Sequence, residues 1–290
     1  MTRDAYCLFW NEIKDSHFMG SRERVPSIRH ELFEDEWLSI GKILLKGFLD
    51  CQYLPLFISQ AFLTFCFFGS VEDTMLIESF KNYLCRDEQE VVENLVKCGI
   101  ENQAIEPDED TMNFLDNFKC NTLPNSGNVE SIVAELARQE LLQKPHLMIS
   151  AWRKAFQSTL SIIGIENPIE LAKLYEQRLP TAKKLLSIII SEPKNAAERD
   201  ADAHFKRYVK GLEQEDLKKL LTFITGSDQI TVNTIRISFV NHYNSEFSRV
   251  PVAHTCAPLL ELPSTYRSFC ELRQEFSAII RQSSWEMDIV

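Results

Sequence analysis

A histidine, a threonine and a cysteine stand in succession at residues 254–256, between Pro251 and Pro258. Cysteine is a strong nucleophile near neutral pH, because a thiol with the ordinary pKa of about 8.5 is already a few per cent thiolate there. A lone cysteine is nevertheless more often a small buried residue than a nucleophile. Cys256 is therefore either structural or reactive, and its surroundings must decide between the two.

His254 lies two residues before Cys256, a spacing that tests the idea of a cysteine–histidine dyad. On an extended strand, side chains two residues apart lie about 6.5–7 Å from one another. The base of a dyad must lie within hydrogen-bond reach of the sulfur, about 3 Å. This geometry favours a structural or positioning role for His254. It also disfavours a cysteine hydrolase, since no glycine-rich nucleophile turn surrounds Cys256 in the sequence.

A cysteine without an adjacent base can still exchange an acyl group with another thiol. One carbon–sulfur bond replaces another in such a transfer, so the reaction is nearly balanced in free energy. Proximity and orientation then matter most, and they can supply roughly 7–11 kcal/mol. The position of Cys256 suits this chemistry, because a side chain in a proline-bracketed loop after a strand can be presented to a partner.

The charge of the chain limits its partners. The 290 residues, enough for one large domain or two lobes, include 31 basic and 42 acidic side chains, for a formal net charge of −11. This excess argues against nucleic acid and against an anionic membrane as the main partner, and it suits docking to a basic protein. The most apolar stretch, residues 54–69, is too short to span a bilayer, so we expect a buried helix there.

Eight cysteines are present, and they are scattered along the chain. No Cys-x-x-Cys occurs, and the His-x-Cys of residues 254–256 has no second ligand pair at zinc-like spacing, so we expect no metal and no cofactor. Residues 1–10 carry charge instead of the apolar run of a secretory signal. We therefore expect free thiols and a cytoplasmic or nuclear location.

The chain before residue 191 has the periodicity of successive helices. Residues 37–51 repeat apolar side chains at helical spacing, and Gly41 and Gly47 among them indicate a closely packed neighbour. Ser59 is a cap candidate for the next helix, and Gly69 is its stop. Further helices are predicted after Asn128, after Pro145, after Asn167 and over about residues 180–191, whereas residues 71–127 are acidic and less regular.

The character of the sequence changes after residue 191. Residues 192–203 lack large apolar side chains and keep charge and alanine, which indicates a solvated connection and a hinge, although a helix could resume within the stretch. Two short helices are predicted next, near residues 205–212 and 216–223. Residues 234–240 then alternate as a half-buried strand does.

The segment around the cysteine is predicted to be extended. Pro251 and Pro258 place it at a sheet edge or a strand end. If it is extended throughout, one face carries Val250, Val252, His254 and Cys256. Ser268 and Glu271 then form a capping box for a final amphipathic helix.

Two ordered blocks of the sequence carry a recognisable motif. In "LLTFITGSDQI", residues 220–230, the motif residues are Phe223, Thr225, Gly226 and Ser227. In "RVPVAHTCAPLLELPSTY", residues 249–266, they are Pro251, His254, Thr255, Cys256, Leu260, Leu262, Pro263 and Tyr266. Together the two blocks resemble the carboxyl-terminal lobe of HECT-type ubiquitin ligases. Residues 31–69 are similar, more loosely, to the amino-terminal lobe of the family.

The resemblance implies an α+β, bilobal HECT-like fold, with a mostly helical larger N-terminal lobe and a smaller α/β C-terminal lobe. Residues 1–30 are then an N-terminal extension, and residues 31–191 form the helical lobe. A region that docks a ubiquitin-conjugating enzyme is expected within residues 71–124. The hinge falls at residues 192–203, and the lobe that carries the cysteine comprises residues 204–290.

The resemblance also implies a function, that of a ubiquitin–protein transferase. Such a protein accepts ubiquitin as a thioester on Cys256 and passes it to a substrate lysine. Its partners would be a ubiquitin-conjugating enzyme, ubiquitin and a protein substrate, with no nucleic acid and no membrane. His254 and Thr255 would have supporting roles.

The sequence departs from the family pattern at several positions. Ala257 and Pro258 replace the usual Phe-Asn after the cysteine, and Met287 stands where a phenylalanine is typical, with Trp285 as a candidate substitute. The docking region is short and divergent, and the long substrate-recruiting regions usual in such ligases are absent, so the chain is expected to be a short member or a fragment. A second interpretation stays open, that of a catalytically inactive HECT-like module that binds ubiquitin or a partner.

Overall fold

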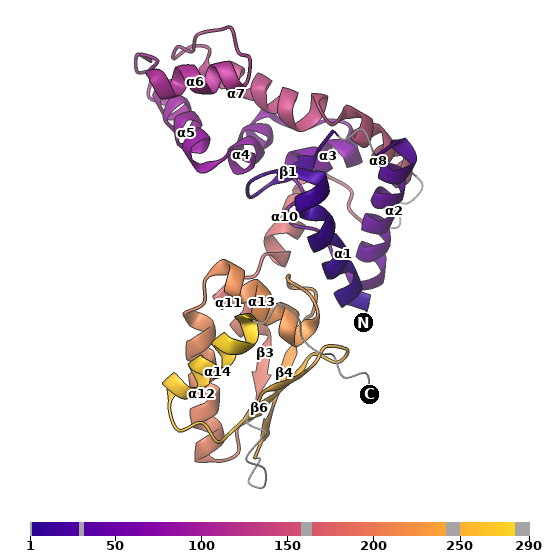
Figure 1. The fold of residues 1–290 in the computed structure, drawn as a ribbon, viewed down its shortest axis with the longest axis vertical. Helices are drawn as coiled ribbons and strands as arrows, with labels where there is room; N and C mark the ends of the chain where they lie inside the picture. The colour runs from indigo at the N-terminus through magenta and orange to yellow at the C-terminus, as the bar shows by residue number, and fades with distance from the viewer. Residues whose placement is uncertain (1, 29–31, 158–163, 242–249, 282–290) are drawn as a thin grey trace. The chain divides into compact units, whose positions relative to one another are not determined.

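The structure is a computed structural model that describes residues 2–28, 32–157, 164–241 and 250–281 (Figure 1). It is α+β, as predicted, with many helices and two small sheets. Residues 242–249 and the predicted features at Trp285 and Met287 lie outside the described residues.

The chain divides into two compact units. The first, here called the C-terminal unit, comprises Met1–Phe9, Asp50–Tyr53 and Glu176–Val290. The second, here called the helical unit, comprises Trp10–Leu49 and Leu54–Tyr175. Two short segments from early in the sequence therefore belong to the same unit as the predicted cysteine site.

Most of the elements of the chain before residue 178 are helices. Helix α1 spans Thr2–His17, and a short antiparallel hairpin follows it, made of β1 (Phe18–Gly20) and β2 (Arg24–Pro26). The later elements are α2 (Glu34–Cys51), α3 (Gln60–Phe68), α4 (Asp73–Tyr83), α5 (Arg86–Ile100), α6 (Glu109–Asn117), α7 (Val129–Arg138), the π-helix η1 (Gln139–Gln143), α8 (His146–Gln157) and α10 (Pro168–Arg178).

The predicted helix signals of this region act as expected. Ser59 accepts a hydrogen bond from the Phe62 N–H at the start of α3, and Gly69 ends the helix in the left-handed conformation with φ 78°. Asn167 Oδ1 accepts the Glu170 N–H at 3.1 Å, and Pro168 occupies the first position of α10. Local capping chemistry therefore fixes these boundaries.

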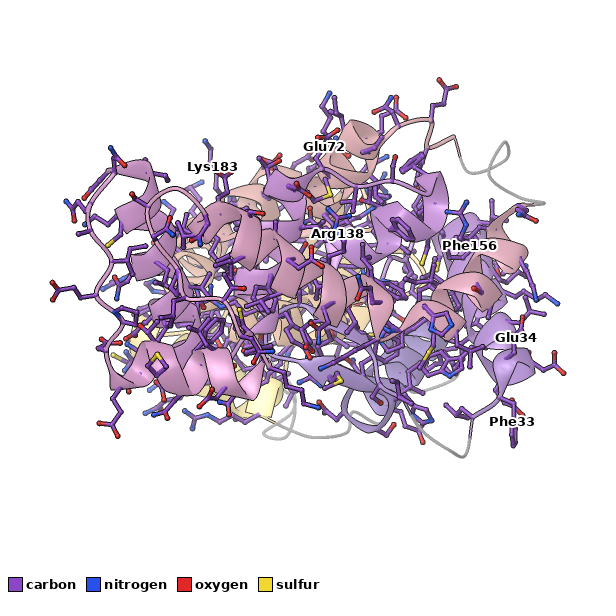
Figure 2. The ribbon with its side chains drawn as sticks, turned by 90° about the horizontal axis from the view of Figure 1, so that it is seen from above. Phe33, Glu34, Glu72, Arg138, Phe156 and Lys183 are labelled. Atoms are coloured by element: carbon purple, nitrogen blue, oxygen red, sulfur yellow. The ribbon has the colours of Figure 1, made fainter. Side chains whose placement is uncertain are left out.

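Helices α2 and α8 pack closely in the core of the helical unit. An ideal Cβ placed on Gly41 would lie 3.1 Å from Cδ1 of Trp152, so the glycine allows the close contact that the sequence predicted. Trp152 is fully buried and meets the Phe62 ring edge-on at 5.4 Å. Phe33, by contrast with the buried Trp152, is 69% exposed. It directly precedes α2 and projects away from the ribbon (Figure 2).

Residues 71–127 are more regular than the sequence suggested. They form α4, α5 and α6. Helix α4 buries Leu76, Ile77, Phe80 and Tyr83, whereas only Val92 and Leu95 are buried on α5. The narrow apolar stripe of α5, in an acidic sequence, gives that helix a weak signal.

The C-terminal unit is built on a four-stranded sheet with the order β3-β4-β6-β5. The strands are β3 (Ile189–Ser191), β4 (Ile235–Val240), β5 (Val252–His254) and β6 (Leu259–Pro263). Strands β3, β4 and β6 are parallel, and β5 pairs antiparallel with β6 at the edge, where a proline-flanked strand was predicted. Strand β4 alternates as predicted, with Ile235 and Ile237 buried.

Four helices pack around this sheet: α11 (Ala182–Ile188), α12 (Ala196–Lys210), α13 (Gln214–Thr225) and α14 (Phe269–Arg281). Helices α12 and α14 lie side by side (Figure 1) and bury Phe205 against Phe276, with ring centroids 5.2 Å apart. Half of the capping box predicted for α14 is present. Ser268 Oγ accepts the Glu271 N–H at 3.3 Å, whereas the Glu271 carboxylate accepts the N–H of Arg267 and not that of Ser268. The unit therefore has its own apolar core.

Two predictions from this part of the sequence need correction. The helix expected over residues 180–191 ends at Ile188, and residues 189–191 form strand β3 instead. Residues 196–203 are not a linker, because they begin α12, the helix that the sequence left possible within this stretch. Most of them are exposed, as their charge indicated, whereas Ala201 is fully buried.

The predicted domain bounds also differ from the compact units. The chain passes from the helical unit to the C-terminal unit at Tyr175–Glu176, before the predicted hinge at residues 192–203. The pivot role of that segment stays a prediction.

Candidate active site

Cys256 lies at the tip of a β-hairpin. Strands β5 and β6 are antiparallel and are joined by a turn of residues 255–258, here called the cysteine turn. The strand ends at His254, so Cys256 does not continue the strand face as predicted but sits in the turn. The Arg236 N–H donates to the Pro258 carbonyl at 2.9 Å and ties the far end of the turn to β4.

The hairpin presents the cysteine to solvent. In β5, Ala253 packs against the core, so Val252 and His254 face outward. Cys256 is exposed, a property that it shares with Cys85 and Cys270 among the described cysteines. An exposed thiol at a turn is accessible to a macromolecular acyl donor, which a buried structural cysteine is not.

His254 interacts with a carboxylate on the neighbouring strand. Its Nε2 lies 3.2 Å from Oε1 of Glu261 in β6, and the two side chains are 48% and 33% exposed. Sequence reasoning did not single out Glu261, although one acidic residue in the apolar run of residues 259–263 could have drawn attention to it. The pairing agrees with a positioning role for His254, which stays a prediction, as does a supporting role for Thr255.

The first of the two resembling blocks, residues 220–230, covers the end of α13 and the turn after it. Gly226 ends the helix with φ 72°, and its N–H donates to the Thr222 carbonyl at 2.8 Å. Thr225 and Ser227 are fully buried, and Thr225 Oγ1 donates to the Leu221 carbonyl at 2.8 Å. This segment, residues 225–229, is here called the glycine turn. Thr225, Ser227 and Gln229 form hydrogen bonds with one another within it.

A cluster of buried titratable groups adjoins the glycine turn. Tyr53 donates its hydroxyl hydrogen bond to Asp228 Oδ1 at 3.1 Å. Burial raises the pKa of Asp228 and holds the pKa of Tyr53 well above its ordinary value. Burial, and next the Asp228 charge, raises the pKa of the Cys7 thiol to about 12. Cys7 is thus protonated near neutral pH and is not a nucleophile.

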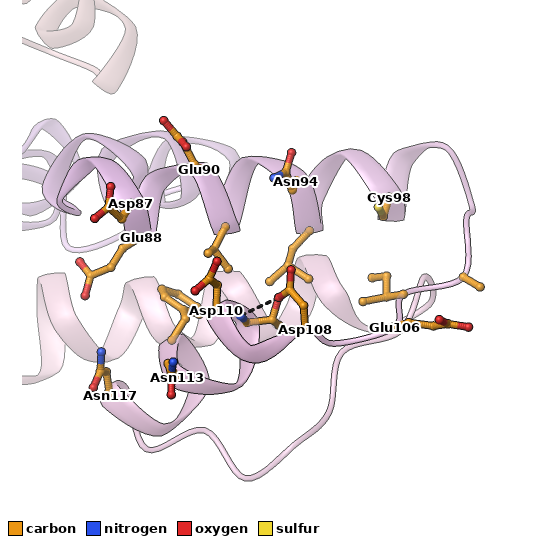
Figure 3. Close-up of a pocket in the computed structure, with 16 residues that line it drawn as sticks. Asp87, Glu88, Glu90, Asn94, Cys98, Glu106, Asp108, Asp110, Asn113 and Asn117 are labelled. Carbon is orange, nitrogen blue, oxygen red and sulfur yellow. Dashed lines mark hydrogen bonds between the residues drawn. The ribbon is translucent and has the colours of Figure 1, made fainter.

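A groove lies in the region where docking was predicted. Its volume is about 750 Å³, and it lies between α5 and α6, with Leu95 and Phe114 among its apolar residues. Glu88 and Asp110 point into it from the two helices (Figure 3). The acidic residues that line this α5–α6 groove are Asp87, Glu88, Glu90, Glu106, Asp108 and Asp110.

Two negative findings hold for the part of the chain that the structure describes. There, no group of three or more histidine, cysteine, aspartate or glutamate side chains could hold a metal ion. In the same residues, every helix is too short or too polar to cross a membrane.

The comparison with known families addresses the whole chain. The sequence matches the family described as HECT-domain (ubiquitin-transferase) over residues 1–289. No curated protein matches it. The family match includes both compact units, the glycine turn and the cysteine turn. The exposed cysteine therefore lies in a chain that belongs to the HECT-domain family of ubiquitin transferases.

Proposed function

We propose that the protein accepts ubiquitin as a thioester on Cys256 and passes it to a lysine of a protein substrate. The observation that carries the proposal is the exposure of Cys256 at a hairpin tip, within a chain of the HECT-domain family. A ubiquitin-conjugating enzyme that carries ubiquitin as a thioester is the donor that the family implies.

The proposed transfer has two balanced steps. The Cys256 thiolate attacks the carbonyl carbon of the donor thioester, a carbon–sulfur bond forms on Cys256, and the donor cysteine leaves as a thiolate. A substrate lysine amine then attacks the new thioester, an isopeptide bond forms, and Cys256 leaves as a thiolate while the amine loses a proton. Because each step exchanges one acyl acceptor for another, positioning supplies most of the catalysis.

A test of this proposal follows the adduct through cysteine variants. The chain is incubated with a panel of ubiquitin-charged conjugating enzymes, and a ubiquitin adduct that is lost on addition of thiol is expected. Cys256→Ala should abolish it. Cys85→Ala and Cys270→Ala are matched controls, because these cysteines are also exposed, and both variants should keep the adduct.

The alternative function is that of an inactive HECT-like module that binds ubiquitin or a partner. Ala257 and Pro258, in place of the usual Phe-Asn, favour it, because they change the surroundings of the sulfur. Binding of ubiquitin without an adduct across the panel would support this alternative and would contradict the transferase proposal.

We also propose that the conjugating enzyme docks at the α5–α6 groove. The acidic lining around the apolar residues suits a partner with a basic rim and an apolar centre. Reversing two of the charges with Asp87→Lys and Asp110→Lys should weaken the interaction about tenfold at low salt, and less at high salt. Glu12→Lys, an exposed acidic residue of α1, is the control and should have no effect. If the variant with Asp87→Lys and Asp110→Lys bound the conjugating enzyme as tightly as the Glu12→Lys control, the docking site would be contradicted.

A further inference from the structure

The first turns of α1 lie against the two turns that carry the family motifs. Residues Met1–Phe9 belong to the C-terminal unit, although residues 1–30 were expected to be an N-terminal extension. The Arg3 guanidinium donates through Nη2 to the carbonyl oxygen of Thr255 in the cysteine turn. This contact joins residues 252 positions apart in the sequence.

The next residue of α1 contacts the glycine turn. Asp4 is buried at 7% exposure, and an ideal Cβ placed on Gly226 would lie 1.8 Å from Asp4 Oδ1. The carboxylate therefore occupies space that any other residue at position 226 would need. The close approach shows that α1 is packed tightly onto this turn.

The following turn of α1 continues the same contact. Cys7 is four residues after Arg3, on the same helix face, and it is buried beside Tyr53 and Asp228. Tyr6 donates its hydroxyl hydrogen bond to Asp50 Oδ2 at 2.8 Å. These contacts fix the position of the first turns of α1 within the C-terminal unit, and they thereby restrain the backbone that carries Arg3.

The bonded carbonyl is close to the sulfur in the covalent structure. The Thr255 carbonyl belongs to the peptide group whose nitrogen is that of Cys256. A hydrogen bond from a charged guanidinium is stronger than a neutral one, and here it restrains the plane of that peptide group. With the Arg236 N–H bound to the Pro258 carbonyl, the cysteine turn is held at both ends.

The contact leaves the sulfur open. Cys256 is exposed, whereas Arg3 and Thr255 are only partly buried. A segment that covered the thiol would have buried it, so the geometry favours a brace over a lid. Arg3 contacts the backbone of the turn, and Cys256 stays exposed to the donor.

We propose that Arg3 is a positioning residue for the transfer reaction, through which α1 braces the cysteine turn in the orientation that accepts the acyl group. The proposal rests on the proposed function of Cys256, because it assigns Arg3 a role in that same site. It adds a residue of the N-terminal segment to a site that the motifs place wholly near the other end of the chain.

The first test needs no transfer. The carbonyl ¹³C shift of Thr255 and the amide ¹⁵N shift of Cys256, which belong to one peptide group, are compared in the wild-type chain and in Arg3→Ala, with Arg22→Ala as the control. Arg22 is an exposed arginine of the helical unit, so its loss removes the same charge without touching the cysteine turn. Arg3→Ala should move both resonances, because a hydrogen bond from a charged donor polarises the carbonyl that accepts it. Unchanged shifts would overturn the brace, whether or not the protein transfers ubiquitin.

The second test uses the thioester reaction. Arg3→Ala should slow single-turnover thioester formation about tenfold at saturating donor, and Arg3→Lys should restore most of the rate because an ammonium also donates to a carbonyl. The half-saturating donor concentration should be unchanged. A normal rate in Arg3→Ala would contradict a positioning role, and a faster rate would show that the contact inhibits.

Reaction with a small alkylating reagent distinguishes a positioning role of Arg3 from a role in activating or shielding the Cys256 thiol. Alkylation of Cys256, followed by peptide mass spectrometry, should change less than about twofold in Arg3→Ala, because the thiol is already exposed. A parallel loss of alkylation and transfer would overturn the proposal by showing that Arg3 acts on the thiolate itself. A large gain would overturn it by showing that Arg3 covers the sulfur. Absence of a wild-type adduct would reject the transferase function separately, since the chemical-shift test does not depend on transfer.

Discussion

The glycine turn and the cysteine turn lie in the same unit and carry equally recognisable motifs, yet they differ in almost every physical respect. The glycine turn is buried, and the hydroxyl of Thr225 forms hydrogen bonds with the Leu221 carbonyl and the Ser227 N–H. The cysteine turn is exposed and has its side chains toward solvent. The first motif therefore reports a packing constraint, whereas the second reports a group that is presented to a partner.

The same contrast applies to the cysteines beside these turns. Burial raises the pKa of Cys7 next to the glycine turn to about 12, which makes it an inert thiol. Cys256 is exposed at the hairpin tip. Residue type alone would not separate the two, and burial does.

The largest expected effect is at Gly226, where the comparison predicts a strict packing requirement. Gly226→Ala should lower the free energy of unfolding by about 2–4 kcal/mol, because φ is 72° and Asp4 fills the space of the new Cβ. Chemical denaturation measures this. Gly211→Ala is the control, since the nearest atom to its Cβ is at 3.7 Å, and it should be nearly neutral.

A double variant sharpens this prediction. Asp4→Ala in the background of Gly226→Ala should recover part of the stability that Gly226→Ala loses, because it removes the clash. The backbone strain of about 1 kcal/mol remains, and the other contacts of Asp4 are lost. Equal stability of Gly226→Ala and Gly211→Ala would show that the glycine turn is not constrained as described.

An intermediate effect concerns pH and Asp228. The pKa of this carboxyl is raised by burial in the folded protein, so the folded state holds the proton more tightly than the unfolded state does. Its contribution to stability is present below the unfolded pKa and is lost as pH rises through the folded pKa. Asp228→Asn keeps the acceptor for Tyr53, and it should be increasingly more stable than the wild type from pH 4 to pH 7, by about 1.4 kcal/mol for each unit of pKa difference. Parallel stability profiles of the two proteins would contradict the assignment.

The smallest effect is expected in the exposed cysteine turn, at the pair of His254 and Glu261. An exposed ion pair contributes under about 1 kcal/mol, so a double-mutant cycle of His254→Ala and Glu261→Ala should give a coupling energy in that range. Thioester formation should fall less than tenfold in His254→Ala if the histidine positions the hairpin. A loss of several hundredfold would instead identify His254 as a base.

Much of the fold could be predicted because its signals are local. The caps at Ser59, Asn167 and Ser268 and the alternation of β4 depend on residues within a few positions of one another. The exposure of Cys256 agreed with its place between two prolines. Each of these features follows from hydrogen bonding or side-chain direction over a short stretch of chain.

The features that could not be predicted depend on distant partners. Strand β3 continues the apolar pattern of the helix before it, and only pairing with β4 makes residues 189–191 a strand. Arg3 and Asp4 have no local signal for their contacts with the two turns. Composition suggested a hinge that overlaps α12, because the exposed first turns of that helix have the same charged, alanine-rich composition as a linker.

The central claim is that Cys256 carries ubiquitin during transfer, and one measurement tests it most directly. The chain is mixed with a charged conjugating enzyme, the reaction is stopped without reducing agent, and mass spectrometry locates the attached carboxyl terminus of ubiquitin. The account predicts attachment to the sulfur of Cys256 in the intermediate and to a lysine nitrogen at later times. Attachment at another cysteine, or a lysine adduct that forms at an undiminished rate in Cys256→Ala, would contradict it.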